Sequence, residues 1–169
     1  MTLLVRTGTP SDAADVARLC WAYRDILLER SAGLPPVLEA YCAADNYAAL
    51  IDDLPRIHAR PGGEILLVER NGCVVGCAMY YPLEIPGVTE IKRVFVDPDA
   101  RRLGAGRALM QAGMAHAAAD GYSRMVLDTI APLTEAILLY ERLGFTPCAP
   151  FYDPDPEFAP FLRFFDHPL

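Results

Sequence analysis

Residues 94–110 read V-F-V-D-P-D-A-R-R-L-G-A-G-R-A-L-M. The β-branched and aromatic residues at 94–96 favour a strand. Asp97-Pro98-Asp99 interrupts that strand, because proline has no backbone N–H and a fixed φ. Apolar residues then return at helical spacing from Leu109 onward. This stretch therefore predicts a strand, a turn and a helix in direct succession.

The turn has the composition of an anion-binding site. A helix N-terminus leaves several backbone N–H groups without partners and carries the positive end of the helix dipole. Glycines at 104 and 106 remove side chains where an anion would touch the backbone. Arg101, Arg102 and Arg107 add positive charge around it. The pattern favours a phosphate site, although an ordinary strand–turn–helix with glycines for packing has the same composition.

Two common phosphate loops do not account for the turn. The dinucleotide fingerprint needs a third glycine where Leu109 stands, and no G-x-x-x-x-G-K-[ST] motif occurs in the chain. What remains is R-x-x-G-x-G immediately after a strand. That pattern resembles the acyl-CoA pyrophosphate loop of the GNAT family of N-acyltransferases.

Composition predicts a single domain spanning residues 1–169, large enough for a proper core. The chain is 53% apolar and its net charge is −7, which argues against a nucleic-acid partner or a basic membrane-surface protein. No signal peptide or membrane-spanning run is recognisable. The five cysteines form no disulfide framework or metal motif, so we expect them to be reduced and the protein to be cytoplasmic, with no metal.

Periodicity and turn signals predict a mixed α/β order of elements. The predicted strands are 3–6, 64–69, 73–81, 89–96, 125–129, 145–152 and 161–165. The predicted helices are one beginning near Asp12, a second at 47–59, a third from the glycine turn to about 120, and a fourth at 133–143. Asn71-Gly72 between two apolar runs is a strong hairpin signal.

Three further segments resemble the GNAT family in the same order along the chain: D-A-A-D-V-A-R-L at 12–19, E-I-K-R-V-F-V at 90–96 and A-I-L-L-Y-E-R-L-G-F at 136–145. The resemblance implies a single-domain, GNAT-like α/β fold, with a mixed, mostly antiparallel central sheet of about seven strands and helices on both faces. It also implies an N-acetyltransferase that moves an acetyl group from acetyl-CoA to a primary amine by direct attack in a ternary complex. The amine could belong to a small molecule, a lysine or an N-terminus. A non-catalytic acyl-CoA-binding regulatory domain is the alternative, and a homodimer stays open.

The resemblance assigns residues to the coenzyme and to catalysis. The main chain of Val94 and Val96 would contact the pantetheine arm. The pyrophosphate would be held by Arg101 and by the amides of Arg102, Gly104, Ala105, Gly106 and Arg107. Tyr140 would be the general acid, and the alternative is a tyrosine that packs the helix to the sheet.

The resemblance also bears on Glu90 and Leu133. Glu90 stands 11 residues before Arg101, the spacing of the general-base glutamate in part of the family, so the resemblance implies a general base there. A carboxylate is a weak base toward an ammonium group and would need burial or a bridging water. The alternative is an exposed strand residue paired with Lys92. Leu133 stands where the family often has asparagine, so one hydrogen bond would be missing or replaced.

Acceptor recognition is the least determined part of the sequence. Aromatic residues and carboxylates suit a small amine or an exposed lysine side chain, but for any single one of these residues core packing or a solvated loop is the simpler explanation. The candidates are Trp21, Tyr23, Tyr80, Tyr81, Phe151 and Tyr152, with Asp52, Asp53, Asp153, Asp155 and Glu157.

Overall fold

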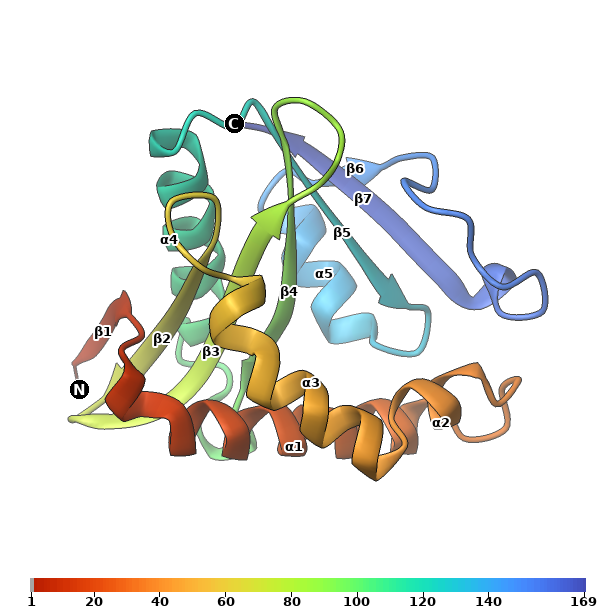
Figure 1. Cartoon of the computed structure of the whole chain (residues 1–169), viewed down its shortest axis with the longest axis horizontal. Helices are drawn as coiled ribbons and strands as arrows, with labels where there is room; N and C mark the ends of the chain where they lie inside the picture. Colours follow the sequence, from red (N-terminus) through yellow and green to blue (C-terminus); the bar gives the residue numbers. More distant parts are fainter. Residues whose placement is uncertain (1) are drawn as a thin grey trace.

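Seven strands form one sheet in the computed structural model, which describes residues 2–169, and their order is β1-β2-β3-β4-β5-β7-β6 (Figure 1). The strands are β1 (Leu3–Thr7), β2 (Glu64–Arg70), β3 (Cys73–Pro82), β4 (Val88–Val96), β5 (Arg124–Ile130), β6 (Thr146–Pro147) and β7 (Leu162–Pro168). The α-helices are α1 (Ala13–Arg30), α2 (Val37–Tyr41), α3 (Ala44–Ile57), α4 (Ala105–Ala119) and α5 (Thr134–Arg142). Only the β4–β5 pair is parallel among the described strands, so the predicted mixed, mostly antiparallel sheet is confirmed.

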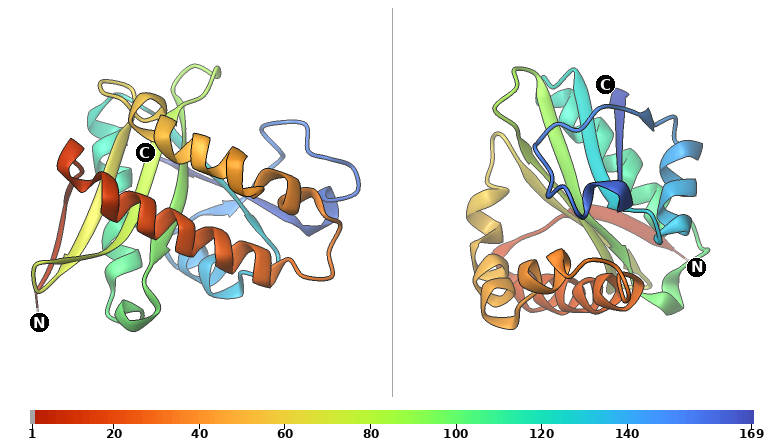
Figure 2. Two further views of the ribbon diagram at one scale, coloured as in Figure 1. Left: turned by 60° about the horizontal axis from the view of Figure 1, so that its bottom comes forward. Right: turned by 90° about the vertical axis from the view of Figure 1, so that its right-hand side faces the viewer.

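Helices cover both faces of the sheet, as predicted (Figure 2). On one face, α1 and α3 pack Leu19 and Leu54 against strand residues such as Leu67 and Met79. On the other face, α4 packs Leu109 and its neighbours against alternate residues of the same strands, and α5 joins this layer. Because side chains alternate along a strand, β2 and β3 supply both layers and read as nearly continuous apolar runs.

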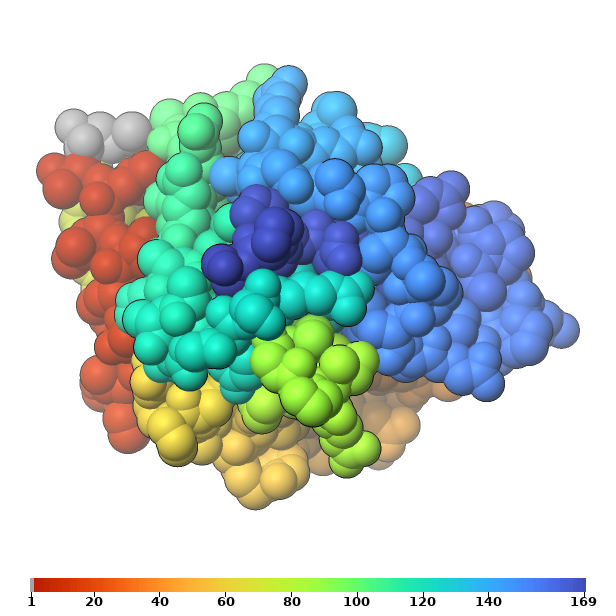
Figure 3. All heavy atoms as spheres, turned by 90° about the horizontal axis from the view of Figure 1, so that it is seen from above, coloured from red at the N-terminus to blue at the C-terminus, as the bar shows by residue number. Residues whose placement is uncertain are grey.

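The parallel pair β4–β5 is short and opens toward one end. Pairing runs only from Val88 opposite Arg124 to Glu90 opposite Val126. Beyond these residues the two strands spread apart, with α5 behind the opening (Figure 1). The other end is packed, since Ser123 N–H donates to Gly87 O at 2.9 Å and Leu169 N–H to Ser123 O at 3.0 Å (Figure 3). The pairing of β4 with β5 is therefore confined to one end of the two strands.

The hairpin between β2 and β3 forms at the predicted turn. Arg70 pairs with Cys73, and the two intervening residues have positive φ, +52° at Asn71 and +83° at Gly72. Positive φ at both central positions defines a type I′ turn, for which Asn-Gly is the preferred sequence.

Three parts of the predicted element order differ from the structure. The strand expected at 145–152 shrinks to Thr146–Pro147, because Pro147 and Pro150 remove backbone donors and the chain leaves the sheet. A short helix, α2, occupies residues 37–41, where no element was predicted; five residues are too few to show a periodicity. Also, α3 starts at Ala44 rather than 47.

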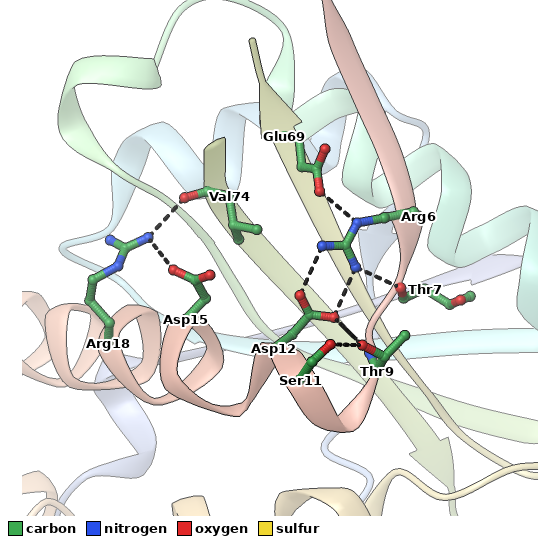
Figure 4. A network of polar contacts seen from close by, with 9 residues as sticks. All are labelled: Arg6, Thr7, Thr9, Ser11, Asp12, Asp15, Arg18, Glu69 and Val74. Carbon is green, nitrogen blue, oxygen red and sulfur yellow. Dashed lines mark hydrogen bonds and ion pairs between the residues drawn. The ribbon is translucent and has the colours of Figure 1, made fainter. Parts of the chain in front are cut away.

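A polar network ties the first strand to the first helix (Figure 4). Arg6 donates to Asp12 through both terminal nitrogens, at 2.8 and 2.9 Å, and its Nε donates to Glu69 at 2.6 Å. Asp12 also accepts the Thr9 N–H at 2.8 Å. The Arg6 guanidinium holds the pKa of Asp12 well below its usual range. These contacts fix the direction of α1 across the sheet.

Candidate functional site

The N-terminus of α4 presents a row of unpaired backbone N–H groups. Gly104 caps the helix at φ +86°, and a Cβ at this position would have no neighbouring atom within 4 Å. Within residues 2–169, the N–H groups of 102–107 make no backbone hydrogen bond, and the first bond back to the cap runs from Ala108 N–H to Gly104 O at 2.9 Å. The positive end of the helix dipole lies at the same place. This arrangement fits a diphosphate.

The three arginines of the turn have different surroundings. Arg101 folds back onto β4, where its Nε donates to Val96 O at 3.0 Å and its guanidinium lies 5.7 Å from the centre of the Phe95 ring. Arg102 and Arg107 are exposed and make no side-chain contact to a carboxylate in the part of the chain described here. Arg101 therefore fixes the turn against the sheet, while the other two can meet a phosphate.

A cleft of about 730 Å³, here called the α4 cleft, lies between β4, α4, α5 and the end of α1. The predicted coenzyme residues and the predicted acid all line it: Val94, Val96, Arg101, Arg102, Gly104, Ala105, Gly106, Arg107 and Tyr140. Sequence reasoning missed Arg30 and Arg142, which bring the arginines on its walls to five, against one carboxylate, Glu135. In a chain of net charge −7 this local excess of positive charge favours an anionic ligand.

Tyr140 reaches the α4 cleft from α5. Its residue is 6% exposed, and its ring lies 6.2 Å from Phe145 and 6.4 Å from Phe165, centre to centre. The hydroxyl has no hydrogen-bond partner among the described residues. Burial raises the pKa of Tyr140, and the Asp128 carboxylate raises it further. The phenol therefore keeps its proton at neutral pH and has it available for a ligand.

Leu133 begins α5 without offering a polar side chain. Its carbonyl accepts the N–H groups of Ala136 and Ile137, both at 3.1 Å. Its side chain packs with Leu27 and Phe158 in a small apolar cluster beside the cleft. The hydrogen bond expected from the family's frequent asparagine is thus absent at this position.

Glu90 lies behind the opening rather than on its wall. The residue is 3% exposed, so the predicted alternative of an exposed strand residue is wrong about exposure. Tyr81 O–H donates to one carboxylate oxygen, and Lys92 Nζ lies 3.3 Å from the other, an ion-pair distance without hydrogen-bond geometry. Glu90 contributes to neither cavity described here.

A second cavity of about 250 Å³, here called the Arg93 cavity, lies on the α1–α3 face beside the α4 cleft. Its walls come from α1, α2, α3, β4, β5 and the segment 152–162. Among the acceptor-side candidates, Tyr23, Tyr152 and Asp155 line it, whereas Tyr80 packs on the opposite, α4 face. Tyr23 also lines the α4 cleft, so the two spaces meet at this side chain.

The polar groups of the Arg93 cavity come mainly from residues that sequence reasoning missed. Asp128 on β5 accepts the Tyr152 O–H at 2.7 Å. Arg93 on β4 donates to the Tyr41 hydroxyl at 3.2 Å. In the sequence, each of these two charged residues is followed or surrounded by apolar strand residues: Asp128 in M-V-L-D-T-I and Arg93 in K-R-V-F-V. Only the pairing of β4 with β5 shows that Asp128 and Arg93 face the same space.

Within residues 2–169, no group of three or more His, Cys, Asp or Glu side chains is placed to hold a metal ion. Over the same residues, no helix combines the length and the apolarity needed to cross a bilayer.

Comparison with known proteins establishes the family. The family model described as the acetyltransferase (GNAT) family matches residues 34–145, more than half of the chain. The protein therefore belongs to the GNAT acetyltransferase family, as its sequence motifs and fold indicate.

Individual relatives agree with this assignment. An uncharacterised N-acetyltransferase of Schizosaccharomyces pombe is 38% identical over 99 residues, which are 57% of this chain and 60% of the relative, so the match spans about three fifths of that protein. An IAA acetyltransferase of Azospirillum brasilense is 38% identical over 120 residues, 70% of this chain and 76% of the relative.

A solved structure shows the same fold. The PaiA N-acetyltransferase of Thermoplasma acidophilum, in complex with coenzyme A, aligns with a TM-score of 0.74 at 13% identity over 100% of both chains. At this identity the likeness concerns the fold alone.

Proposed function

We propose that this protein transfers an acetyl group from acetyl-CoA to a primary amine by direct attack in a ternary complex. The observation that carries the proposal is the convergence of the motif residues on one space. The motif residues of β4 and of the glycine turn and Tyr140 of α5, identified separately in the sequence, all line the α4 cleft: residues 94, 96, 101, 102, 104–107 and 140. Membership of the GNAT family and its acetyltransferase relatives supports the same chemistry.

The chain would hold the coenzyme mainly through its backbone. The N–H groups of 102–107 would bind the diphosphate, and the exposed side chains of Arg102 and Arg107 would meet its charge. Val94 and Val96 would contact the pantetheine arm from β4, which has no β5 partner there. The Val96 carbonyl already accepts from Arg101, so that contact would have to be shared. When bound, acetyl-CoA supplies the activated acetyl thioester.

Tyr140 would stabilise the leaving sulfur. A thiol with a pKa near 8.5 is a stronger acid than a phenol whose pKa burial has raised, so full proton transfer from Tyr140 is unfavourable. A hydrogen bond from its unpartnered hydroxyl to the developing thiolate is favourable in the transition state. We therefore assign Tyr140 as the donor to sulfur.

The attacking amine needs a group that accepts its proton or binds it in place. An amine with a pKa near 10.4 is neutral in only about one molecule in 10³ at pH 7. Asp128 lines the Arg93 cavity directly, and Glu90 could act only through Lys92 or a water. We therefore propose that Asp128 holds the amine and passes the proton lost from its nitrogen to solvent, as the C–N bond forms and the C–S bond breaks. Glu90 is kept as the alternative base suggested by the sequence.

The test is a direct assay with a panel of small amines, peptides with a free N-terminus and lysine peptides. Released CoA is measured by chromatography and acetylated products by mass spectrometry, and CoA affinity is measured by calorimetry. Acetylated product from at least one class of amine supports the proposal. Tight CoA binding with no acetylated product from any amine would favour the regulatory, non-catalytic alternative. Homodimerisation and a cytoplasmic location stay predictions from the sequence.

A further inference from the structure

Arg93 is a buried cation with most of its hydrogen-bonding capacity unused. The residue is 7% exposed and lines the Arg93 cavity. Its guanidinium carries five N–H donors, and the described residues take only one of them, through the Tyr41 hydroxyl at 3.2 Å. Buried charges are ordinarily paired with an opposite charge, because an unpaired one costs several kcal/mol.

No carboxylate of residues 2–169 lies within ion-pair distance of Arg93. Burial lowers the pKa of Arg93, and the side chains that raise it are three tyrosines and a cysteine rather than carboxylates: Tyr41, Cys20, Tyr47 and Tyr23. The neighbouring Lys92 is different, since it lies 3.3 Å from Glu90. Of these two consecutive cations, Lys92 therefore has a carboxylate partner among the described residues, and Arg93 has none.

The backbone at this position is also unfavourable. Arg93 has φ +52°, which few non-glycine residues adopt, and it lies where the register between β3 and β4 shifts. Such a bulge re-aims one side chain relative to its neighbours. At this bulge the Arg93 guanidinium lines the cavity, so an unfavourable backbone conformation and an unpaired charge occur in the same residue. Strained residues of this kind cluster at functional sites.

We propose that Arg93 binds the carboxylate of the acceptor, so that the substrates are small molecules with both a primary amine and a carboxylate, of the amino-acid type. This inference rests on the proposed acetyl transfer. A guanidinium with free donors matches a carboxylate through two parallel hydrogen bonds. Asp128, on the facing strand, would receive the ammonium group.

The remaining walls describe the rest of the acceptor. Leu27, Leu38 and Phe158 are among the residues that enclose the space, so an apolar side chain fits better than a charged one. The volume of about 250 Å³ is below the usual range of drug-sized pockets, roughly 300–1,000 Å³, which favours a small molecule. Tyr23 marks the side on which the amine would meet the α4 cleft.

The first experiment compares matched acceptors with acetyl-CoA and the full chain. Phenylalanine is compared with phenylalaninamide and 2-phenylethylamine, and leucine with leucinamide and isoamylamine. For the wild type we expect kcat/KM to be at least about 100-fold higher for the acid than for its amide, as for a site built to bind a group that the analogue lacks. Amides accepted as well as the acids in both series would overturn the inference.

Substitutions of Arg93 test whether this residue causes the preference for acids over amides. In Arg93→Met, the acid-to-amide ratio of kcat/KM should fall to near one, and Arg93→Lys should recover part of it, since lysine keeps the charge but not the planar fork. Arg56→Met, an exposed arginine on α3 paired with Asp53, is the matched control and should keep the wild-type ratio. A preference that persists in a folded Arg93→Met protein would place the carboxylate elsewhere.

A binding measurement on the wild type covers the case in which Arg93→Met does not fold. Calorimetry with N-acetylphenylalanine and N-acetylphenylalaninamide, in the presence of CoA, should show the acid binding at least about tenfold more tightly. Equal affinities would overturn the carboxylate site. If no amine is acetylated while the acid still binds more tightly, the proposed transfer fails and the anion site stands.

Discussion

The α4 cleft and the Arg93 cavity meet at Tyr23 but are built differently. The α4 cleft takes most of its polar groups from one continuous segment, with backbone N–H groups and surface arginines aimed at one place. The Arg93 cavity takes its polar groups from side chains on separate elements: buried Arg93 donates to exposed Tyr41, and half-buried Asp128 accepts from exposed Tyr152. Backbone amides and a helix dipole recognise any diphosphate, whereas individually placed charges select one acceptor. The first site therefore suits a coenzyme common to a family, and the second suits a particular substrate.

The largest effect should come from Tyr140→Phe. This variant tests whether the α4 cleft also supplies a group for catalysis, in addition to binding the coenzyme. Removing the hydroxyl deletes the hydrogen bond to the leaving sulfur and little else, because the ring still packs on Phe145 and Phe165. We expect kcat to fall about 10³-fold, at the upper end of the range for removing one hydrogen-bond donor to a charge that develops in the transition state. The affinity for CoA, measured by calorimetry, should change less than about twofold. A variant with near wild-type kcat would show that another group supports the thiolate.

The contrast between the two sites also explains how much the sequence could predict. Gly104, Gly106 and the three arginines are neighbours in the chain, so their joint role was readable before the fold was known. Asn71-Gly72 was readable for the same reason, since a two-residue turn depends only on local backbone preference. These local signals predicted the hairpin and the phosphate-binding turn at the start of α4.

The Arg93 cavity could not be predicted in the same way. Arg93 and Asp128 lie 35 positions apart and face one space only because β4 and β5 pair over three residues and then separate. Glu90 has the right spacing for a base, yet pairing places it behind Lys92 and away from both cavities. Which face and which depth a strand residue occupies depends on register, and register is a property of the whole sheet.

The pH dependence of the free energy of unfolding should test the burial of charge on the side of the sheet that carries the Arg93 cavity. His58, on the α3 side, is 3% exposed, with Nδ1 2.9 Å from Tyr80 O and Nε2 without a partner. Burial lowers the pKa of His58 from 6.5 to about 4, and nearby Arg93 and Lys92 lower it in the same direction. Between these pH values the unfolded chain binds a proton that the folded chain does not, so stability falls as the pH drops from 6.5 toward 4.

The expected loss for His58 is of order 3 kcal/mol across that window, measured by urea unfolding at several pH values. His58→Asn removes the titrating ring and should flatten the pH dependence between 4 and 6.5. Parallel pH curves for wild type and His58→Asn would mean that His58 is protonated without cost in the folded protein.

A comparison of Asp128→Asn with Glu90→Gln decides which carboxylate accepts the proton of the amine. Asparagine at 128 can still accept the Tyr152 O–H, so the cavity should keep its shape while losing a charge. We expect kcat/KM for the amine to fall about 10²-fold in Asp128→Asn and about tenfold or less in Glu90→Gln, with CoA affinity kept in both. The measurement is steady-state kinetics at saturating acetyl-CoA. The reverse order would assign the base to Glu90 and require a water or Lys92 to connect it with the amine.

The smallest effect we predict is for Gly106→Ala. This variant should weaken CoA binding without lowering the thermal stability, which separates a loss of binding from a loss of folding. A Cβ there would lie 3.3 Å from Leu139 Cδ2, a flexible side-chain end, and 3.9 Å from Val96 Cγ2. Alanine is a better helix former than glycine, so Gly106→Ala should keep or slightly raise the thermal stability. The same methyl group intrudes on the α4 cleft, so the Kd for CoA should rise about tenfold, by calorimetry. Gly104→Ala is a less clean variant, because φ +86° there strains any side chain even though the space is open. An unchanged Kd in a stable Gly106→Ala protein would mean that the diphosphate does not lie on the N-terminus of α4, and the contrast between a backbone-built and a side-chain-built site would then lose its first half.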